Sequence, residues 1–230
     1  MNLATIEEDV RVYHRVRFRF DPERAKVWRA LCRYLQPWVD PEGGLLDLGA
    51  GYGEFSRFAQ AGRKWALDIN PDLAGYWPED VIPVIQPAVD PLPLVSGSLR
   101  TVFASNFFEH FSTEDGLRIL AEVRRVLHSD GRFIVIQPNF RLEPRRYFDD
   151  YTHKTAYTDA GFAGLLGAAG FQVVHSEPRF TPFTMQSRWP KAEWMVSLYL
   201  RLPYRPLAGQ FLTVAKPLEV SAMEGSNVAR

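Results

Sequence analysis

The feature that most constrains the fold is a glycine-rich turn after a short apolar run. Residues 45–58 read LLDLGAGYGEFSRF, with glycine at Gly49, Gly51 and Gly53 and an amphipathic segment directly after them. An apolar run cut off by glycines and followed by a helical pattern predicts a strand, a tight turn and a helix. Glycine adopts positive φ readily and places no side chain between the main chain and a ligand. We therefore expect this turn, Ala50 included, to touch a cofactor.

The spacing of the glycines argues against a pyrophosphate cradle. The turn has the pattern G-x-G-x-G, and Glu54 stands where the dinucleotide pattern G-x-G-x-x-G has its last glycine. Asp68 ends the next apolar run, about 20 residues beyond the first strand, where nucleotide-binding α/β units place the carboxylate that accepts from ribose hydroxyls. Asp47 adds a negative charge beside the turn. These residues suit a nucleoside that carries an amine or a cation.

Two segments resemble the first two motifs of the class I S-adenosylmethionine-dependent methyltransferases: LLDLGAGYGEF (45–55) and ALDINPD (66–72). The resemblance implies S-adenosyl-L-methionine as the cofactor and S-adenosyl-L-homocysteine as the product. It places the ribose on Asp68, next to Ile69, and the amino acid end at the glycine turn and Asp47. It also implies a Rossmann-like α/β fold: a seven-stranded, mostly parallel sheet with helices on both faces and an insertion between the last two strands.

Further residues of the cofactor site follow from the same resemblance. Residues 89–98 resemble the loop whose acid meets the adenine amine, and Asp90 is the carboxylate in it; the alternative role is an aspartate that makes a turn before proline. Asn106 follows the predicted fourth strand, at the edge of the sheet where ligands bind, and is expected to line the methyl-donor site. His110 either holds this segment by hydrogen bonds or acts in catalysis. His128 is expected to cap the preceding helix's end before the fifth strand.

The segment after the fifth strand is the predicted acceptor site, because loops at the carboxyl edge of a sheet usually carry specific chemistry. Residues 137–158 are dense in polar aromatic and ionisable side chains, and the expected substrate-binding residues are Tyr147, Asp149, Asp150 and Tyr151. A hydroxyl acceptor needs a base to take its proton. His153, beside two aspartates, is the predicted base, with His110 as a second catalytic candidate.

Composition and length limit the organisation and the partners. The 230 residues suit an N-terminal helical segment or lid (1–40), a methyltransferase domain (41–216) and a flexible tail (217–230). A formal net charge of zero gives no field that favours nucleic acid. The chain has one cysteine, no apolar stretch at its start and no run of about 18 apolar residues, so a cytoplasmic location is expected.

Two further features bear on metals and partners. No metal is predicted, because the five histidines are scattered along the sequence without ligand spacing. The predicted insertion, residues 176–209, is crowded with aromatic and aliphatic side chains, and basic residues lie near the ends of its segment 189–205. This segment can lie in a bilayer interface as a peripheral membrane contact. Alternatively, it packs on its own domain or on a second subunit.

The function predicted from the sequence is methyl transfer to a small-molecule, sugar or glycolipid-type acceptor, favouring O-methylation. The segments GAGYGEF, DINPD, RYFDDYTHK and LYLRLP resemble bacterial methyltransferases that accompany polysaccharide and glycolipid synthesis, and specialised-metabolite biosynthesis is equally compatible. The alternative is a catalytically inactive methyltransferase-fold scaffold at a membrane surface. A dehydrogenase is disfavoured by the glycine spacing and by the missing second mononucleotide-binding half.

Overall fold

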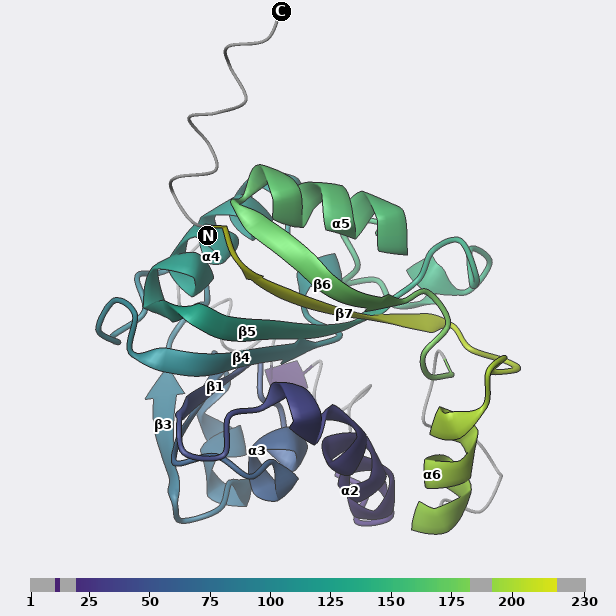
Figure 1. Ribbon diagram of the computed structural model, residues 1–230, viewed down its shortest axis with the longest axis horizontal. Helices are drawn as coiled ribbons and strands as arrows, with labels where there is room; N and C mark the ends of the chain where they lie inside the picture. The colour runs from purple at the N-terminus through teal and green to yellow at the C-terminus, as the bar shows by residue number, and fades with distance from the viewer. Residues whose placement is uncertain (1–10, 13–19, 183–191, 219–230) are drawn as a thin grey trace, which may run out of the picture.

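A seven-stranded sheet organises the structure, a computed structural model that describes residues 11–12, 20–182 and 192–218 (Figure 1). The strand order is β3-β2-β1-β4-β5-β7-β6, and β7 alone runs antiparallel to its neighbours. This confirms the predicted fold class. The strands are β1 (Gly44–Leu48), β2 (Arg63–Asp68), β3 (Val81–Ile85), β4 (Leu99–Ser105), β5 (Leu127–Pro138), β6 (Phe171–Glu177) and β7 (Gln210–Pro217).

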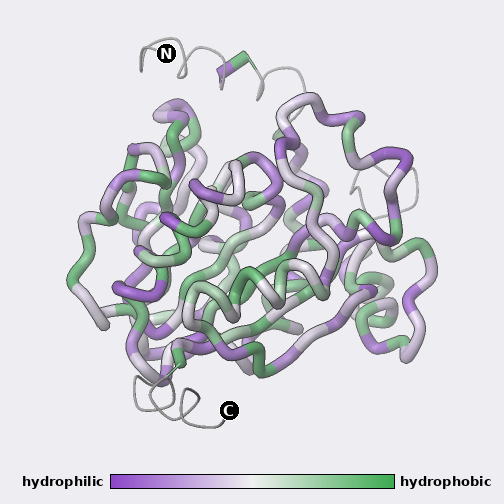
Figure 2. The backbone as a smooth tube through the Cα atoms, turned by 90° about the horizontal axis from the view of Figure 1, so that it is seen from above, coloured by the Kyte–Doolittle hydropathy of each residue, from purple (hydrophilic) through white to green (hydrophobic). Residues whose placement is uncertain are grey.

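Helices cover both faces of the sheet, because alternate strand residues point to opposite faces. Phe103 and Ile134 pack with the helices of one face, whereas Val102 and Phe133 pack with those of the other. The first face carries α2 (Arg24–Leu35), α3 (Glu54–Phe58) and α6 (Glu193–Arg201), and the second carries α4 (Thr113–Val126) and α5 (Asp159–Ala168). Figure 2 shows hydrophobic residues along the central elements and hydrophilic residues frequent in the loops around them.

The strand order reverses between β1 and β4, and this reversal positions the candidate site. The chain moves outward from β1 to β2 and β3, then returns to β4 on the other side of β1. Leu48 at the end of β1 pairs with Ala104 near the end of the parallel β4, so the segments after both strands begin side by side. Open α/β sheets bind their ligands at such a reversal, outside the carboxyl ends of the strands.

The segment between β6 and β7 packs on its own domain in the described part, which is one of the arrangements expected from the sequence. Leu200 of α6 is buried in the same cluster as Trp28 and Leu31 of α2. Arg33 of α2 pairs with Glu193 at the start of α6, with 2.7 Å between nitrogen and oxygen. Figure 1 shows these two helices next to each other. The insertion therefore joins the N-terminal helix to the last strands.

Some predictions lie outside the described residues, and one is wrong. Residues 1–10 and 13–19 of the predicted lid segment and residues 219–230 of the predicted tail lie outside the described part, so the lid and the flexible tail stay predictions. His128 does not cap a helix: α4 ends at Val126, and His128 is the second residue of β5, where its Nδ1 lies 2.8 Å from an Arg100 nitrogen. Among the described helices, none is long and apolar enough to cross a membrane.

Candidate active site

The glycine turn between β1 and α3 has the predicted backbone geometry. Gly49, Gly51 and Gly53 have φ angles of 72°, 55° and 71°, in the left-handed region that favours glycine. A Cβ at Gly49 would also lie 2.4 Å from Cδ2 of Phe107, and one at Gly53 would lie 2.6 Å from Cδ1 of Trp77. Two of the glycines are therefore required by aromatic packing as well as by the turn.

Asp68 lies against this turn, as predicted. The Gly51 amide donates to its Oδ2 at 3.0 Å, and the Asn70 amide donates to its Oδ1, also at 3.0 Å. The amides of Gly49 and Ala50 both donate to the carbonyl of Leu67, each at 2.9 Å. These bonds tie the turn to the carboxyl end of β2, and Ile69 follows directly as a partly buried residue. Asp68, the residue predicted to bind the ribose, and the glycine turn, predicted to contact the cofactor, thus form one hydrogen-bonded unit.

Asp47 has a different environment from the one expected. Its Oδ2 accepts hydrogen bonds from the Ser56 amide at 3.1 Å and from the Ser56 hydroxyl at 2.6 Å, so it fixes the start of α3 under the turn. Burial raises the pKa of this carboxyl from 3.8 to about 7, against the lowering effect of the Ser56 hydrogen bonds. Asp47 is therefore not a permanent negative charge at neutral pH, and its contact with a cofactor stays a prediction.

The remaining predicted cofactor residues lie on either side of β4. Asp90 is exposed in the loop before β4, and its amide donates to the Pro87 carbonyl at 3.2 Å, which makes the local turn that was the alternative interpretation. Asn106 follows β4 with a φ of 48°, and its Oδ1 accepts a hydrogen bond from Nε2 of the Gln210 side chain. Asn106 therefore lies at the carboxyl edge next to the glycine turn, whereas the adenine contact of Asp90 stays a prediction.

The loop after β5 divides its predicted substrate residues between interior and surface. Tyr147, in the short helix η4 (Tyr147–Asp149), is fully buried: its hydroxyl donates to the Thr155 carbonyl at 2.9 Å and accepts from the Tyr157 amide at 3.2 Å. Burial raises its pKa. Tyr147 thus holds the loop together, although the sequence suggested a substrate contact. Tyr151, by contrast, is 72% exposed. Asp149 is exposed, and Asp150 is partly buried.

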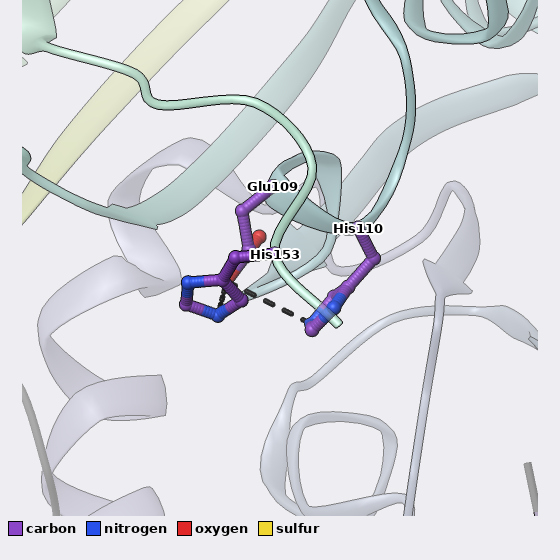
Figure 3. A group of neighbouring side chains, drawn as sticks. All are labelled: Glu109, His110 and His153. Carbon is purple, nitrogen blue, oxygen red and sulfur yellow. Dashed lines mark ion pairs between the residues drawn. The ribbon is translucent and has the colours of Figure 1, made fainter. Parts of the chain in front are cut away.

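Glu109, His110 and His153 form a cluster at the carboxyl edge (Figure 3). The backbone carbonyl of Glu109 accepts from the amide of Lys154 at 2.7 Å, which brings the two loops together. Oε1 of Glu109 then lies 3.9 Å from Nε2 of His110 and 3.9 Å from Nε2 of His153. From the sequence, both histidines are expected at this edge, and Glu109, one residue before His110 in the segment that follows β4, is expected to orient that turn or to face the substrate. The approach of His153 to Glu109 was not expected from the sequence.

Burial controls the charges in this cluster. Glu109 is fully buried, and burial raises its pKa to about 8 although the Gln137 amide donates to Oε2 at 2.6 Å. Burial, and next the neighbouring His153, lower the pKa of His110 to about 4, so His110 is neutral at physiological pH. The arrangement is therefore suited to hold a proton or a cation between these side chains.

The side chain of His110 lies in a network of hydrogen bonds. The Thr152 hydroxyl donates to Oδ1 of Asp150 at 2.6 Å, and the same hydroxyl oxygen lies 2.9 Å from Nδ1 of His110. Nε2 is the ring nitrogen of His110 that faces Glu109.

Comparisons with known proteins agree with this architecture. A family model described as "Methyltransferase domain" matches residues 46–135. The "Ubiquinone/menaquinone biosynthesis C-methyltransferase UbiE" of Paraburkholderia phymatum is 28% identical over 144 residues, which are 56% of this chain. The match spans only 57% of that relative's length.

Solved structures show the same fold. A SAM-dependent methyltransferase from Archaeoglobus fulgidus aligns with a TM-score of 0.65 and 19% identity, covering 90% of this chain and 99% of the other. A Haloferax volcanii methyltransferase, described as putative and solved in complex with the activator Trm112, aligns with a TM-score of 0.64 and 21% identity over 85% of this chain and 91% of the other. Residues 46–135 are therefore similar to that methyltransferase domain, and the seven-stranded sheet has the fold of these solved methyltransferases.

Proposed function

We propose that this chain transfers a methyl group from S-adenosylmethionine to a small-molecule acceptor. The observation that carries the proposal is the hydrogen bond between the Gly51 amide and Asp68. It joins the glycine turn, which follows β1 at the reversal of the strand order, to an acid at the end of the neighbouring β2. The turn offers main chain to the amino acid end of the cofactor. Asp68 offers carboxylate oxygens to the ribose. The family match over residues 46–135 supports the same cofactor.

Methyl transfer asks the protein mainly to position two reactants. The acceptor atom attacks the methyl carbon in line with the carbon–sulfur bond, that bond breaks, and neutral S-adenosylhomocysteine leaves. Holding donor and acceptor in this geometry supplies much of the rate. If the acceptor is a hydroxyl, its proton must also be removed. The loops after β1, β4 and β5 lie at one edge of the sheet and are the elements expected to do this.

We favour O-methylation of a sugar, glycolipid or metabolite hydroxyl. Tyr151, Asp149 and Asp150 give the loop after β5 a ring and carboxylates of the kind that contact hydroxylated molecules. As catalytic candidates, His110 and His153 differ in access, since their side chains are 26% and 6% exposed. A second candidate is C-methylation of a quinone-type ring, supported by the similarity to UbiE over 144 residues.

Calorimetric titration with S-adenosylmethionine and S-adenosylhomocysteine tests the first part of the proposal. We expect binding by the wild-type chain and binding weaker by about 10-fold or more in Asp68→Asn, since a hydrogen bond to a charged group contributes about 1.5–3 kcal/mol. Asp130→Asn, at an exposed position near the start of β5, is the matched control. Absence of binding by the wild-type chain would refute the proposed function.

A label-transfer assay tests the acceptor. The methyl-labelled cofactor is incubated with hydroxylated sugars, lipid-linked sugars and quinone-type rings, and the position of the label is read by mass spectrometry. Label on oxygen supports the favoured acceptor class. Label on a ring carbon would refute O-methylation and support C-methylation of a quinone-type ring instead.

We also propose a peripheral contact of the insertion with lipid. The outward side of α6 and the residues after it expose Trp194, Leu198 and Tyr204, with Arg201 beside them. Aromatic and aliphatic side chains with a neighbouring cation suit a bilayer interface. Sedimentation with anionic vesicles tests this: Trp194→Ser should reduce the bound fraction, whereas dependence of the oligomeric state on Trp194 would instead indicate contact with a second copy.

A further inference from the structure

Glu109 presents an unusual problem of hydrogen bonding. It is fully buried, and its Oε1 accepts no hydrogen bond from the residues that the structure describes. Buried polar oxygens are rarely left in this way, because the loss of hydration is not compensated. The groups that face Oε1 are the Nε2 atoms of His110 and His153, each 3.9 Å away, which is too long for a hydrogen bond.

We propose that Glu109, His110 and His153 form a binding site for one divalent transition-metal ion. One ring nitrogen of each histidine and one carboxylate oxygen of Glu109 lie within 4.8 Å of one another (Figure 3). Tetrahedral coordination by a zinc-like ion at about 2.0–2.2 Å would place such atoms roughly 3.4 Å apart. A small inward movement of the side chains therefore suffices. The ion would supply the positive partner that Oε1 lacks.

The donor set indicates the class of ion. Two imidazole nitrogens with one carboxylate suit zinc, iron or cobalt, whereas calcium and magnesium prefer sites made only of oxygen. Three protein ligands also leave one position open in a tetrahedral site, as in catalytic rather than structural zinc sites. The side chain of His110 is the most exposed of the three, so the open position is expected on its side.

The surroundings of His110 support a ligand role. Nδ1 lies 2.9 Å from the hydroxyl of Thr152, which itself donates to Asp150. Nε2 is the ring nitrogen that faces Glu109. In metal-bound histidines the second ring nitrogen is commonly held by a hydrogen bond of this kind, which fixes the ring orientation. Gln137 holds the other oxygen of Glu109 through a hydrogen bond of 2.6 Å.

The site differs from a general base in its chemistry. An ion would occupy the Nε2 lone pairs that a base uses, and it would instead bind an acceptor oxygen and lower the pKa of its proton. This catalytic role rests on the proposed methyl transfer. The binding of the metal does not.

Calorimetric titration of the full chain with Zn²⁺, after removal of metal by a chelator, tests the proposal. We expect one ion per chain. Glu109→Gln and His153→Asn should weaken binding by more than about 100-fold, and Thr152→Val by about 10- to 100-fold, as for residues that orient a ligand. His128→Asn, which removes a histidine outside the cluster, should bind as the wild type does. Co²⁺ absorption spectra of the same samples report whether the ion is bound by nitrogen and oxygen.

Two results would overturn the proposal: a wild-type chain that binds no Zn²⁺, or equal binding by wild type, Glu109→Gln and His153→Asn. Circular dichroism shows whether each variant is folded, and Thr152→Val keeps the test valid if the buried Glu109 does not tolerate replacement. S-adenosylmethionine binding is measured on the same samples. If the wild-type chain binds the cofactor but not Zn²⁺, the metal site is refuted and the proposed function stands. If it binds Zn²⁺ but not the cofactor, the proposed function is refuted and the metal site stands.

Discussion

The replacement of Gly49 by alanine tests whether the glycine turn is held by aromatic packing. Gly49 has a φ of 72°, and alanine in the left-handed region is less stable by about 1–2 kcal/mol. The new Cβ would lie 2.4 Å from the Phe107 ring. That ring packs against Phe108 and Phe111, with centroids 5.2 and 4.8 Å away, so it has little room to move. Overpacking of this kind costs about 1–3 kcal/mol.

Gly97→Ala separates the two contributions. Gly97 has a similar φ of 68° and nothing within 4 Å of its Cβ position, so its replacement measures the backbone contribution alone. Urea unfolding should show that Gly49→Ala is less stable than Gly97→Ala by about 1–3 kcal/mol. Phe107→Leu should recover part of this difference when combined with Gly49→Ala. Equal losses in the two single variants would refute the reasoning, because the clash would then contribute nothing.

The same variants connect packing to cofactor binding. The Gly49 amide donates to the Leu67 carbonyl in the unit that also holds Asp68. A displaced turn should therefore weaken binding of S-adenosylhomocysteine in Gly49→Ala, measured by calorimetry, whereas Gly97→Ala should bind as the wild type does.

Two further predictions concern buried groups. The pKa of Asp47 is raised from 3.8 to about 7, so the folded state binds the proton more tightly; stability should fall as pH rises between these values, by up to about 1.4 kcal/mol per pH unit from this group. Urea unfolding of Asp47→Asn should show a flatter pH dependence than wild type, and an unchanged slope would contradict the assignment. Tyr147→Phe leaves the Thr155 carbonyl and the Tyr157 amide without their buried partner and should lose about 1–3 kcal/mol of stability, whereas Tyr151→Phe should lose almost none in the same experiment.

The architecture and the cofactor turn were predictable because their signals are local. Apolar runs mark the strands, and the three glycines mark the turn between β1 and α3. The position of Asp68 followed from its distance along the chain beyond the turn. His128 was misplaced because a helical pattern runs directly into β5, and no glycine or proline marks the boundary at Val126.

The cluster at Glu109 was not predictable from local patterns. His153 lies far from His110 in sequence and reaches it through contacts between the two loops, among them the hydrogen bond from the Lys154 amide to the Glu109 carbonyl. Spacing along the chain, on which the expectation of no metal rested, carries no information on such a contact. Tyr147 shows the same limit, since nothing in its neighbours distinguishes a tyrosine that packs inside a loop from one that faces a substrate.

The place of β7 between β5 and β6 has a consequence for how the chain is made. β6 pairs only with β7 in the described sheet, and β7 pairs with β5. β7 follows β6 in the sequence and is therefore synthesised later. Until then the outer edge of β5 has open amide and carbonyl groups, and newly synthesised chains with open strand edges are prone to join one another. The segment containing α6 lies between the two strands in the sequence, so its length sets how long the edge of β5 stays unpaired during synthesis.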